Sequence, residues 1–398
     1  MDRTSVDYAP MVHLYAEHLQ NIRTLSIQAS LATTSNQETK ATLCAKRDFL
    51  TLEHEGEKAT IRLPVSLGSH SDVTLIIPAP PTKDLTFRLN IEERPDAAGA
   101  LSNGVPSSEI ILPWIASDFT PETAVSCATC QTDLVRRGQV QQWKDLPSEG
   151  WAEMMDFWHC HKPDEPHGHS NEADNVGRGF AASSKLVARP GIGLVGPMDF
   201  LLAAGDCPEL ELQSASVLCP GCHTCIGVLD PGTEGYKLRK PNLSVSVGPS
   251  SLSLDYSHEK WLSSALLTAA ESQGVRRLAV YASDDGAGNA VSITHVWLFA
   301  PDLRIASSAA ETPEAMRVLK VLYRDDVATD YENLGKMSGV EGELEVSKEE
   351  WREMRSLLDQ SVKLLPEKAR RFQQWNVGLL KRFTGDDVSD LRGLSHSP

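Results

Sequence analysis

The stretches Cys127–Cys130 (CATC) and Cys219–Cys222 (CPGC) decide how distant parts of this chain come together. Each is a Cys-x-x-Cys knuckle in a turn-like setting, and Pro-Gly in the second is strong turn chemistry. Together they supply four thiolates, the ligand set that a tetrahedral structural Zn²⁺ prefers. The long separation of the two pairs costs little closure entropy. We therefore predict that Cys127, Cys130, Cys219 and Cys222 bind one structural zinc ion, against the alternative of buried free cysteines.

The composition excludes several classes of protein. With 398 residues, of which 41% are hydrophobic, the chain is long enough for two or three domains with cores of their own. Its formal net charge of -16 argues against direct binding to nucleic acid or to anionic membranes. We see no signal peptide and no apolar run long enough to span a membrane. We expect a cytoplasmic or nuclear protein whose eight cysteines bind metal or stay free, without forming disulfides.

Residues 1–242 are expected to be rich in β-structure. Short apolar runs separated by Pro, Gly and Ser clusters are typical of antiparallel strands, and they lie at 60–65, 73–77, 85–91 and 110–115. The zinc module would occupy about residues 120–235 of this region. The polar stretches 30–42 and 162–184 have no apolar period, so we predict loops or disordered segments there.

From residue 243 the pattern changes to a mixture of helices and strands. We predict an α+β region over 243–398, with a polar tail from about residue 385. One helix is expected at 257–272, ended by Gly274, and strands at 277–282, 291–299 and 303–307. The pattern at 316–323 fits either a helix or a strand, and we favour a strand. Another helix should begin after Ser347, because Ser347 and Glu350 form an S-x-x-E capping box before an apolar face that includes Trp351 and Met354.

The segment 151–161 (WAEMMDFWHCH) could carry chemistry of its own. Its apolar residues recur at helical spacing, which predicts a helix that ends at His159-Cys160-His161. A neighbouring protonated histidine lowers the pKa of a thiol, so Cys160 is a candidate nucleophile. In the competing account, Trp158, Cys160 and His161 pack around the zinc module and orient its ligands. We favour the packing account. Cys160, His161 or Cys225 could also replace one of the four predicted zinc ligands.

Two other motif matches are rejected. Gly191–Gly196 has the letters G-x-G-x-x-G, but a dinucleotide fingerprint should open a helix and Pro197 stands where that helix would begin. We expect an irregular loop there. Zinc deaminases need a His-x-Glu or Cys-x-Glu pair upstream of Pro-Cys-x-x-Cys. Leu218 precedes Cys219, and no such pair lies near Cys160. A site of four thiolates also leaves no position for substrate water, which makes it structural.

The order of these motifs gives the chain a resemblance to one family. The motifs are the first knuckle, L-P-S-E-x-W-x-E-M-x-D-x-W-x-C-H at Leu146–His161, G-x-x-D-F-L-L at Gly196–Leu202, and C-x-x-C-x-x-x-[IL]-G at Cys219–Gly227. In this pattern the chain resembles the HECT-like, ubiquitin-conjugating-enzyme (E2)-binding proteins, which are proposed ubiquitin ligases. Cys225 is extra to the last motif, which favours Cys219 and Cys222 as the ligands.

The resemblance implies a HECT-like carboxy-terminal region and a ligase activity. The protein would bind a conjugating enzyme charged with ubiquitin and promote transfer of the ubiquitin to a lysine of a protein substrate. A HECT ligase relays ubiquitin through a cysteine near its carboxy terminus, but no cysteine follows Cys225. A covalent relay would therefore need an upstream thiol, for which Cys160 is the best candidate. Otherwise the protein would align the charged enzyme for direct transfer.

The resemblance also implies an alternative that is not catalytic. Related members are associated with the pre-mRNA 3′-end cleavage machinery through its endonuclease subunit. In this alternative the chain is a zinc-stapled binding module that stabilises such a cleavage factor. Acceleration of ubiquitin discharge from a conjugating enzyme separates the two hypotheses.

Overall fold

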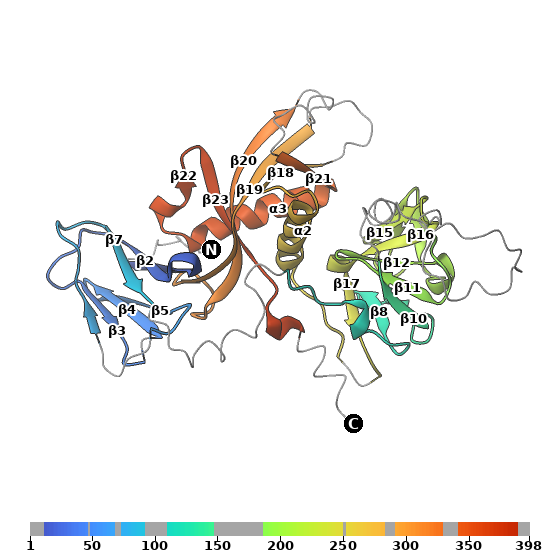
Figure 1. Ribbon diagram of the computed structural model, residues 1–398, viewed down its shortest axis with the longest axis horizontal. Coiled ribbons are helices and arrows are strands. Elements are labelled where there is room, and N and C mark those ends of the chain that lie inside the picture. The colour runs from blue at the N-terminus through green and yellow to red at the C-terminus, as the bar shows by residue number, and fades with distance from the viewer. Residues whose placement is uncertain are drawn as a thin grey trace, which may run out of the picture. The chain divides into compact units, whose positions relative to one another are not determined.

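The computed structural model describes residues 12–46, 48–67, 73–91, 110–146, 186–249, 252–282, 291–328 and 341–388 (Figure 1). The chain divides into two compact units. The first unit combines two segments that are far apart in sequence, Met1–Ile111 and His258–Gly385. The second unit consists of Leu112–Ser257 with Asp386–Pro398. The first unit is therefore discontinuous in sequence.

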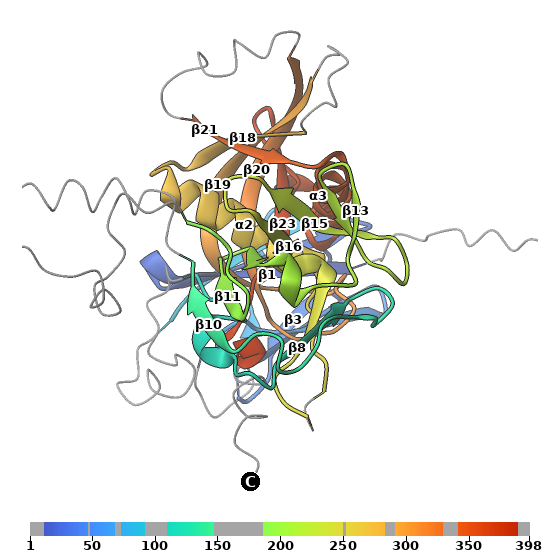
Figure 2. The same cartoon turned by 90° about the vertical axis from the view of Figure 1, so that its right-hand side faces the viewer.

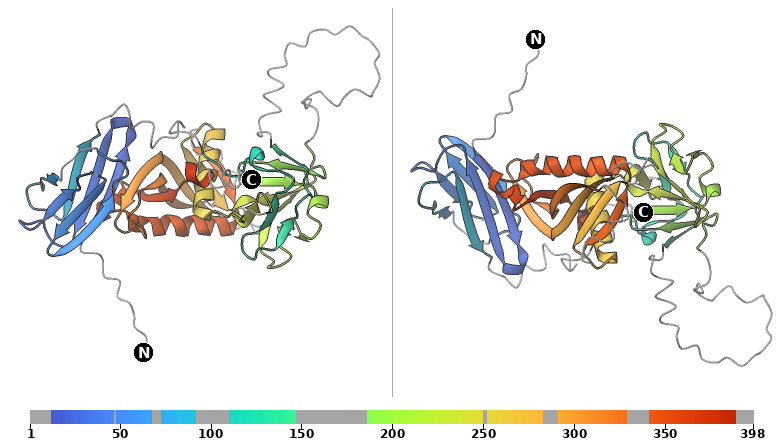
Figure 3. Two further views of the ribbon diagram at one scale, coloured as in Figure 1. Left: turned by 90° about the horizontal axis from the view of Figure 1, so that it is seen from below. Right: turned by 90° about the horizontal axis from the view of Figure 1, so that it is seen from above.

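A nine-stranded sheet forms the centre of the first unit. Its main path runs β22-β23-β20-β19-β1-β2-β7, and β18 joins it at β19 with β21 beyond. The strands are β1 (Val12–Leu19), β2 (Thr24–Leu31), β7 (Asp84–Asn90), β18 (Arg277–Ala282), β19 (Val291–Ser307), β20 (Met316–Ala328), β21 (Glu341–Val346), β22 (Arg371–Phe372) and β23 (Trp375–Lys381). Tyr15 of β1 pairs with Ser307 of β19, so strands from the two ends of the chain meet here, as the blue and orange strands in Figure 3 show.

A four-stranded sheet packs on the amino-terminal strands of the same unit. It has the order β5-β4-β3-β6, with β3 (Lys40–Leu43), β4 (Phe49–His54), β5 (Glu57–Arg62) and β6 (Val73–Leu75). Every second residue of β4 is buried, because side chains alternate between the two faces of a strand. Leu50 and Leu52 of this strand share a core with Leu14, Leu25 and Ile27.

Two helices contribute to a second core of the first unit, α2 (His258–Ser272) and α3 (Lys348–Ser361). Helix α3 begins where the capping box predicts, since the Glu350 amide donates to Ser347 Oγ and the Ser347 amide to the Glu350 carboxylate. Met354 and Leu358 face a core that includes Leu266 of α2. Figure 2 shows β18 and β21 side by side; they pair in parallel.

The second unit contains a seven-stranded and a three-stranded sheet. The larger has the order β10-β11-β12-β16-β15-β14-β13 and the smaller β17-β8-β9. The strands are β8 (Ala124–Cys127), β9 (Asp133–Val135), β10 (Gln142–Asp145), β11 (Ile192–Val195), β12 (Asp199–Leu202), β13 (Glu211–Gln213), β14 (Ser216–Leu218), β15 (Cys225–Asp230), β16 (Gly235–Arg239) and β17 (Leu243–Ser246). Short 3₁₀ helices of the two units are η1 (Gln20–Ile22), η2 (Ala116–Asp118), η3 (Ala204–Asp206), η4 (Lys240–Asn242), η6 (Val362–Leu364) and η7 (Glu367–Ala369).

A lysine lies within the aromatic core of the second unit. Lys240 is 1% exposed, and its Nζ donates to the carbonyl oxygen of Trp114 over 2.9 Å and lies 5.2 Å from the centre of the Phe200 ring. Burial lowers the pKa of Lys240 to about 7, although the carboxylates of Asp199 and Asp145 oppose this effect. A buried charge of this kind is costly, so the stability of this unit should depend on pH.

The predicted fold class is wrong. The described residues are β-rich in both halves of the chain, and those within 243–398 do not form an α+β HECT-like region. The strands after residue 276 join β1, β2 and β7 in one sheet, and β17 pairs with β8 of the second unit. The error arose because local apolar periodicity identifies strands but not their partners. Whether 1–242 and 243–398 behave as separate domains stays a prediction.

Several local predictions agree with the structure and others do not. The helix at 257–272, its end at Gly274 with φ of 65°, and the strands at 277–282 and 316–323 are confirmed. The strand at 110–115 is wrong, since no strand forms there. Part of the predicted loop 30–42 belongs to β2 and β3. Gly191–Gly196 is not an irregular loop, because it contains β11. Gly193 is required in β11 because a Cβ there would lie 2.5 Å from the Trp143 ring.

Candidate metal centre

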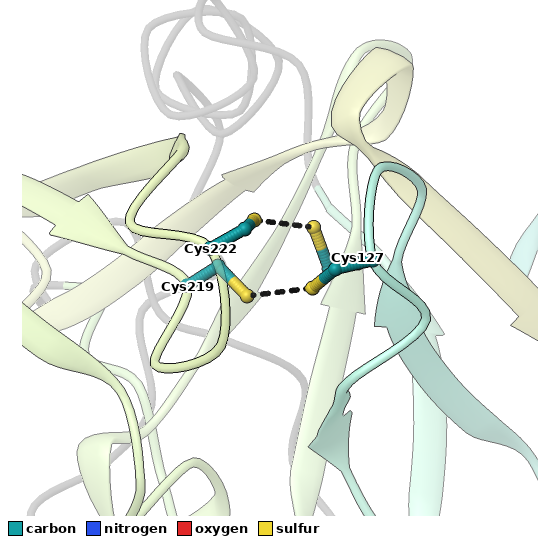
Figure 4. A group of neighbouring side chains, drawn as sticks. Cys127, Cys219 and Cys222 are labelled. Atoms are coloured by element: carbon teal, nitrogen blue, oxygen red, sulfur yellow. Dashed lines mark hydrogen bonds between the residues drawn. The ribbon is translucent and has the colours of Figure 1, made fainter.

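Four cysteine sulfurs of the second unit form a compact group. The Sγ atoms of Cys127, Cys130, Cys219 and Cys222 all lie within 4.8 Å of one another. Cys127 Sγ is 3.7 Å from Cys222 Sγ, and Cys130 Sγ is 3.5 Å from Cys219 Sγ, so each knuckle faces the other (Figure 4). In a tetrahedral site with metal–sulfur bonds of about 2.3 Å, the sulfurs would be about 3.8 Å apart. The spacing and the soft donor set therefore fit a metal ion held by four cysteines.

The two knuckles have the same backbone geometry. We define the first knuckle as Cys127–Thr132 and the second as Cys219–Thr224. The residue after the second cysteine has a positive φ in both, 61° at Gln131 and 58° at His223, which is uncommon for residues other than glycine. The amide of the first cysteine donates to the carbonyl oxygen of the threonine, over 2.9 Å in the first knuckle and 3.0 Å in the second. The shared pattern C-x-x-C-x-T thus folds twice into one ligand-presenting loop.

The four thiols fall into an inner pair and an outer pair. Cys127 and Cys219 form the inner pair and are buried, whereas Cys130 is exposed and Cys222 partly exposed. Burial raises the pKa of the Cys127 thiol and raises the pKa of Cys219 to about 12. Hydrogen bonding with Thr132 lowers the pKa of Cys130 to about 6, and Thr224 lowers the pKa of Cys222 in the same way. A bound cation would supply the charge that the inner pair needs in order to ionise.

The candidate site joins the two sheets of the second unit. The first knuckle follows β8 of the three-stranded sheet, and the second lies between β14 and β15 of the seven-stranded sheet. Asn242 links them, because its carbonyl oxygen accepts from the Ala128 amide over 3.0 Å and its Nδ2 donates to the Cys225 carbonyl oxygen over 3.0 Å. This arrangement allows a metal to hold two sheets together.

Gly221 has a packing role that the turn interpretation of Pro-Gly did not reveal. A Cβ at Gly221 would lie 2.2 Å from Thr132 Oγ1 and 3.3 Å from Cys130 Sγ. A glycine is therefore required because the first knuckle approaches its backbone closely. Sequence reasoning also missed Thr132, Thr224 and Asn242. The repeat of threonine two residues after each second cysteine was the available signal for the first two.

The remaining predicted site residues are not brought to this centre by the described structure. Cys225 is exposed and its thiol donates to the Gly227 carbonyl oxygen over 3.4 Å. It is not a member of the four-sulfur group. Cys160, Trp158 and His161 lie outside the described residues. The nucleophile and packing accounts of that segment therefore stay predictions.

Comparison with known proteins gives one family and distant relatives. The sequence model described as HECT-like Ubiquitin-conjugating enzyme (E2)-binding matches residues 17–377. An uncharacterized protein of Saccharomyces cerevisiae is 24% identical over 319 residues, which cover 74% of this chain and 86% of that protein. An uncharacterized protein of Schizosaccharomyces pombe is 26% identical over 303 residues, covering 70% of this chain and 79% of that protein. No solved structure matches the chain. No helix in the described ranges is long and apolar enough to cross a membrane.

Proposed function

The chain belongs to the HECT-like ubiquitin-conjugating enzyme (E2)-binding family, and on that premise we propose that it is a ubiquitin ligase. It would bind a conjugating enzyme charged with ubiquitin and promote transfer of the ubiquitin to a lysine of a protein substrate. The observation that carries the proposal is the extent of the family match. Residues 17–377 begin within β1 and end within β23 of the first unit, and they include both knuckles of the second.

For the chemistry, we propose direct transfer. The amine of the substrate lysine attacks the thioester carbonyl on the conjugating enzyme, an isopeptide bond forms, and the enzyme's thiolate leaves. This ligase would act by holding the two reactants in a productive arrangement. The competing route adds a relay, in which the Cys160 thiolate first takes the ubiquitin as a thioester and then yields it to the lysine.

Five of the described cysteines are poorly suited to a relay, and Cys160 is the first residue to test. Cys207 is buried, and burial raises its pKa to about 12, so it is a poor nucleophile at neutral pH. Cys127, Cys130, Cys219 and Cys222 are grouped as a candidate metal site. A thiol that binds a metal is not available for a ubiquitin thioester.

We propose that the bound metal is Zn²⁺ and that its role is structural. A set of four thiolates satisfies the tetrahedral preference of zinc and leaves no position for a reacting water. Cys127 and Cys130 would hold it from one sheet, and Cys219 and Cys222 from the other. The ion would stabilise the second unit and take no part in ubiquitin transfer. Trp158 and His161 stay proposed outer partners of this site.

The test is a discharge assay with a panel of ubiquitin-charged conjugating enzymes. We expect the protein to bind at least one of them and to accelerate loss of ubiquitin to free lysine. The Cys160→Ala variant should retain the acceleration, and neither protein should carry a reductant-sensitive ubiquitin adduct. Cys44→Ala serves as a matched control, because Cys44 lies in the first unit outside the sulfur group.

Three outcomes separate the hypotheses. An adduct on the wild type that is absent from folded, metal-replete Cys160→Ala would establish the relay. If the protein binds charged enzymes of the panel but accelerates ubiquitin discharge from none of them, the ligase proposal is refuted and the non-catalytic binding module is supported. The absence of binding to every charged enzyme would refute the proposed function altogether.

A further inference from the structure

Two threonine hydroxyls lie at equivalent places beside the candidate metal centre. Thr132 Oγ1 is 3.2 Å from the sulfur of Cys130, and Thr224 Oγ1 is 3.2 Å from the sulfur of Cys222. Both threonines lie two residues after the cysteine that they contact, in loops of the same backbone geometry. The duplicated contact is thus a property of the knuckle, shared by two segments of different sequence.

The hydroxyls contact only one class of ligand sulfur. Both contacted sulfurs belong to the outer pair, whereas Cys127 and Cys219 are buried. The Cys219 sulfur instead accepts from the backbone amide of Gly221 over 3.4 Å. Burial already shields the inner sulfurs from reagents in solvent. The two sulfurs that solvent can reach are the two that have a threonine hydroxyl beside them.

The direction of these hydrogen bonds follows from the charge on sulfur. A protonated thiol can donate to a hydroxyl oxygen, but a metal-bound thiolate has no proton, so the hydroxyl must donate. A hydrogen bond to a charged acceptor is stronger than one between neutral groups. It withdraws electron density from the sulfur lone pairs, which lowers the nucleophilicity of the thiolate. Among the described contacts, the sulfur is the partner of each of these hydroxyls.

The second knuckle limits the space around the Thr132 side chain. A Cβ on Gly221 of the second knuckle would lie 2.2 Å from Thr132 Oγ1, so the second knuckle packs directly against this hydroxyl. Thr132 is also partly buried. The first hydroxyl therefore lies in a fitted position between the two knuckles.

We propose that Thr132 and Thr224 are positioning residues that protect the outer thiolates of the metal-loaded site and so prolong metal retention. The inference rests on the proposed zinc site. An electrophile such as iodoacetamide is attacked by a ligand sulfur, a carbon–sulfur bond forms and iodide leaves. The product is a neutral thioether, which is a weaker ligand than a thiolate, so the metal is released. The hydroxyls would slow the first step.

The experiment measures metal release from the full chain loaded with Zn²⁺. The variants are Thr132→Val and Thr224→Val, which keep the side-chain shape but lose the hydroxyl, and Thr132→Ser and Thr224→Ser, which keep it. Thr129→Val is the matched control, because Thr129 lies in the first knuckle and is exposed. Metal content is measured first, and release on addition of iodoacetamide is then followed with a metallochromic indicator.

The valine variants should start with the same metal content as the wild type and release it faster, by about tenfold, the usual scale for loss of an outer hydrogen bond to a ligand. The serine variants and Thr129→Val should release it at the wild-type rate. In the Co²⁺-loaded proteins, only the valine variants should shift the thiolate-to-metal charge-transfer band. Gly221 approaches Thr132 closely, so Thr132→Val could disturb packing as well as remove a hydroxyl. Thr224→Val tests the loss of the hydroxyl away from that close approach.

Three results would overturn the inference, and the last, which concerns the metal site itself, is distinguishable from the first two. Metal-replete valine variants that release zinc at the wild-type rate would show that the hydroxyls have no protective role. Serine variants that release zinc as fast as the valine variants would lead to the same conclusion. A wild-type chain that takes up neither Zn²⁺ nor Co²⁺ would overturn the metal site itself, which the initial metal content reveals before any release is measured.

Discussion

Replacement of Lys240 by methionine should change how the stability of the second unit depends on pH. Lys240 is 1% exposed, and its Nζ donates to carbonyl oxygens of Trp114 and Pro197 at 2.9 and 3.4 Å. Methionine keeps an unbranched side chain of similar length and removes the charge. The variant therefore isolates the cost of the buried ammonium group.

The size of the effect follows from the pKa of Lys240, which burial lowers from 10.5 to about 7. That difference corresponds to about 5 kcal/mol between the two protonation states. The folded protein binds this proton more weakly than the unfolded chain does. Stability from this group is therefore fully present above pH 10.5 and is lost as the pH falls through 10.5 toward 7. Within that window the slope is about 1.4 kcal/mol per pH unit.

The assay is urea denaturation of the wild type, Lys240→Met and Lys144→Met between pH 7 and 10. Lys144 is an exposed residue of β10 and controls for the general loss of a positive charge. The wild type and Lys144→Met should gain about 4 kcal/mol over this range relative to Lys240→Met. Parallel pH profiles for the wild type and Lys240→Met would refute the reasoning, because Lys240 would then ionise alike in the folded and unfolded chains.

Three further predictions concern the candidate centre and α3. Cys222→Ser should lower the zinc content below one equivalent and lower the melting temperature, whereas Cys44→Ser should leave both values unchanged. Equal zinc content in the two variants would contradict the assigned ligands. Gly221→Ala should also lose zinc, since its Cβ would lie 2.2 Å from Thr132 Oγ1; full zinc content would show that the knuckles can separate. Ser347→Ala should cost about 1 kcal/mol in chemical denaturation through loss of the α3 cap, and an unchanged midpoint would count against the capping box.

The sequence by itself determined the features that depend on neighbouring residues. Ser347 and Glu350 are three positions apart, so their reciprocal cap can be recognised without knowledge of the rest of the fold. The same holds for the Cys-x-x-Cys spacing, which presents two sulfurs from one turn. The four-sulfur group was predictable because only these two knuckles supply matched pairs of soft ligands. The structural role proposed for it rests on the number of thiolates.

Only the tertiary structure decided which distant segments meet. The pairing of Tyr15 with Ser307 puts the two ends of the chain in one sheet, and it overturned the α+β class predicted for the carboxy-terminal half. The approach of Gly221 to Thr132 and the bridge through Asn242 likewise join segments far apart in sequence. The physical reason is that a strand's apolar period specifies which face is buried and leaves its partner open. The partner is selected by packing and hydrogen bonding across the whole unit.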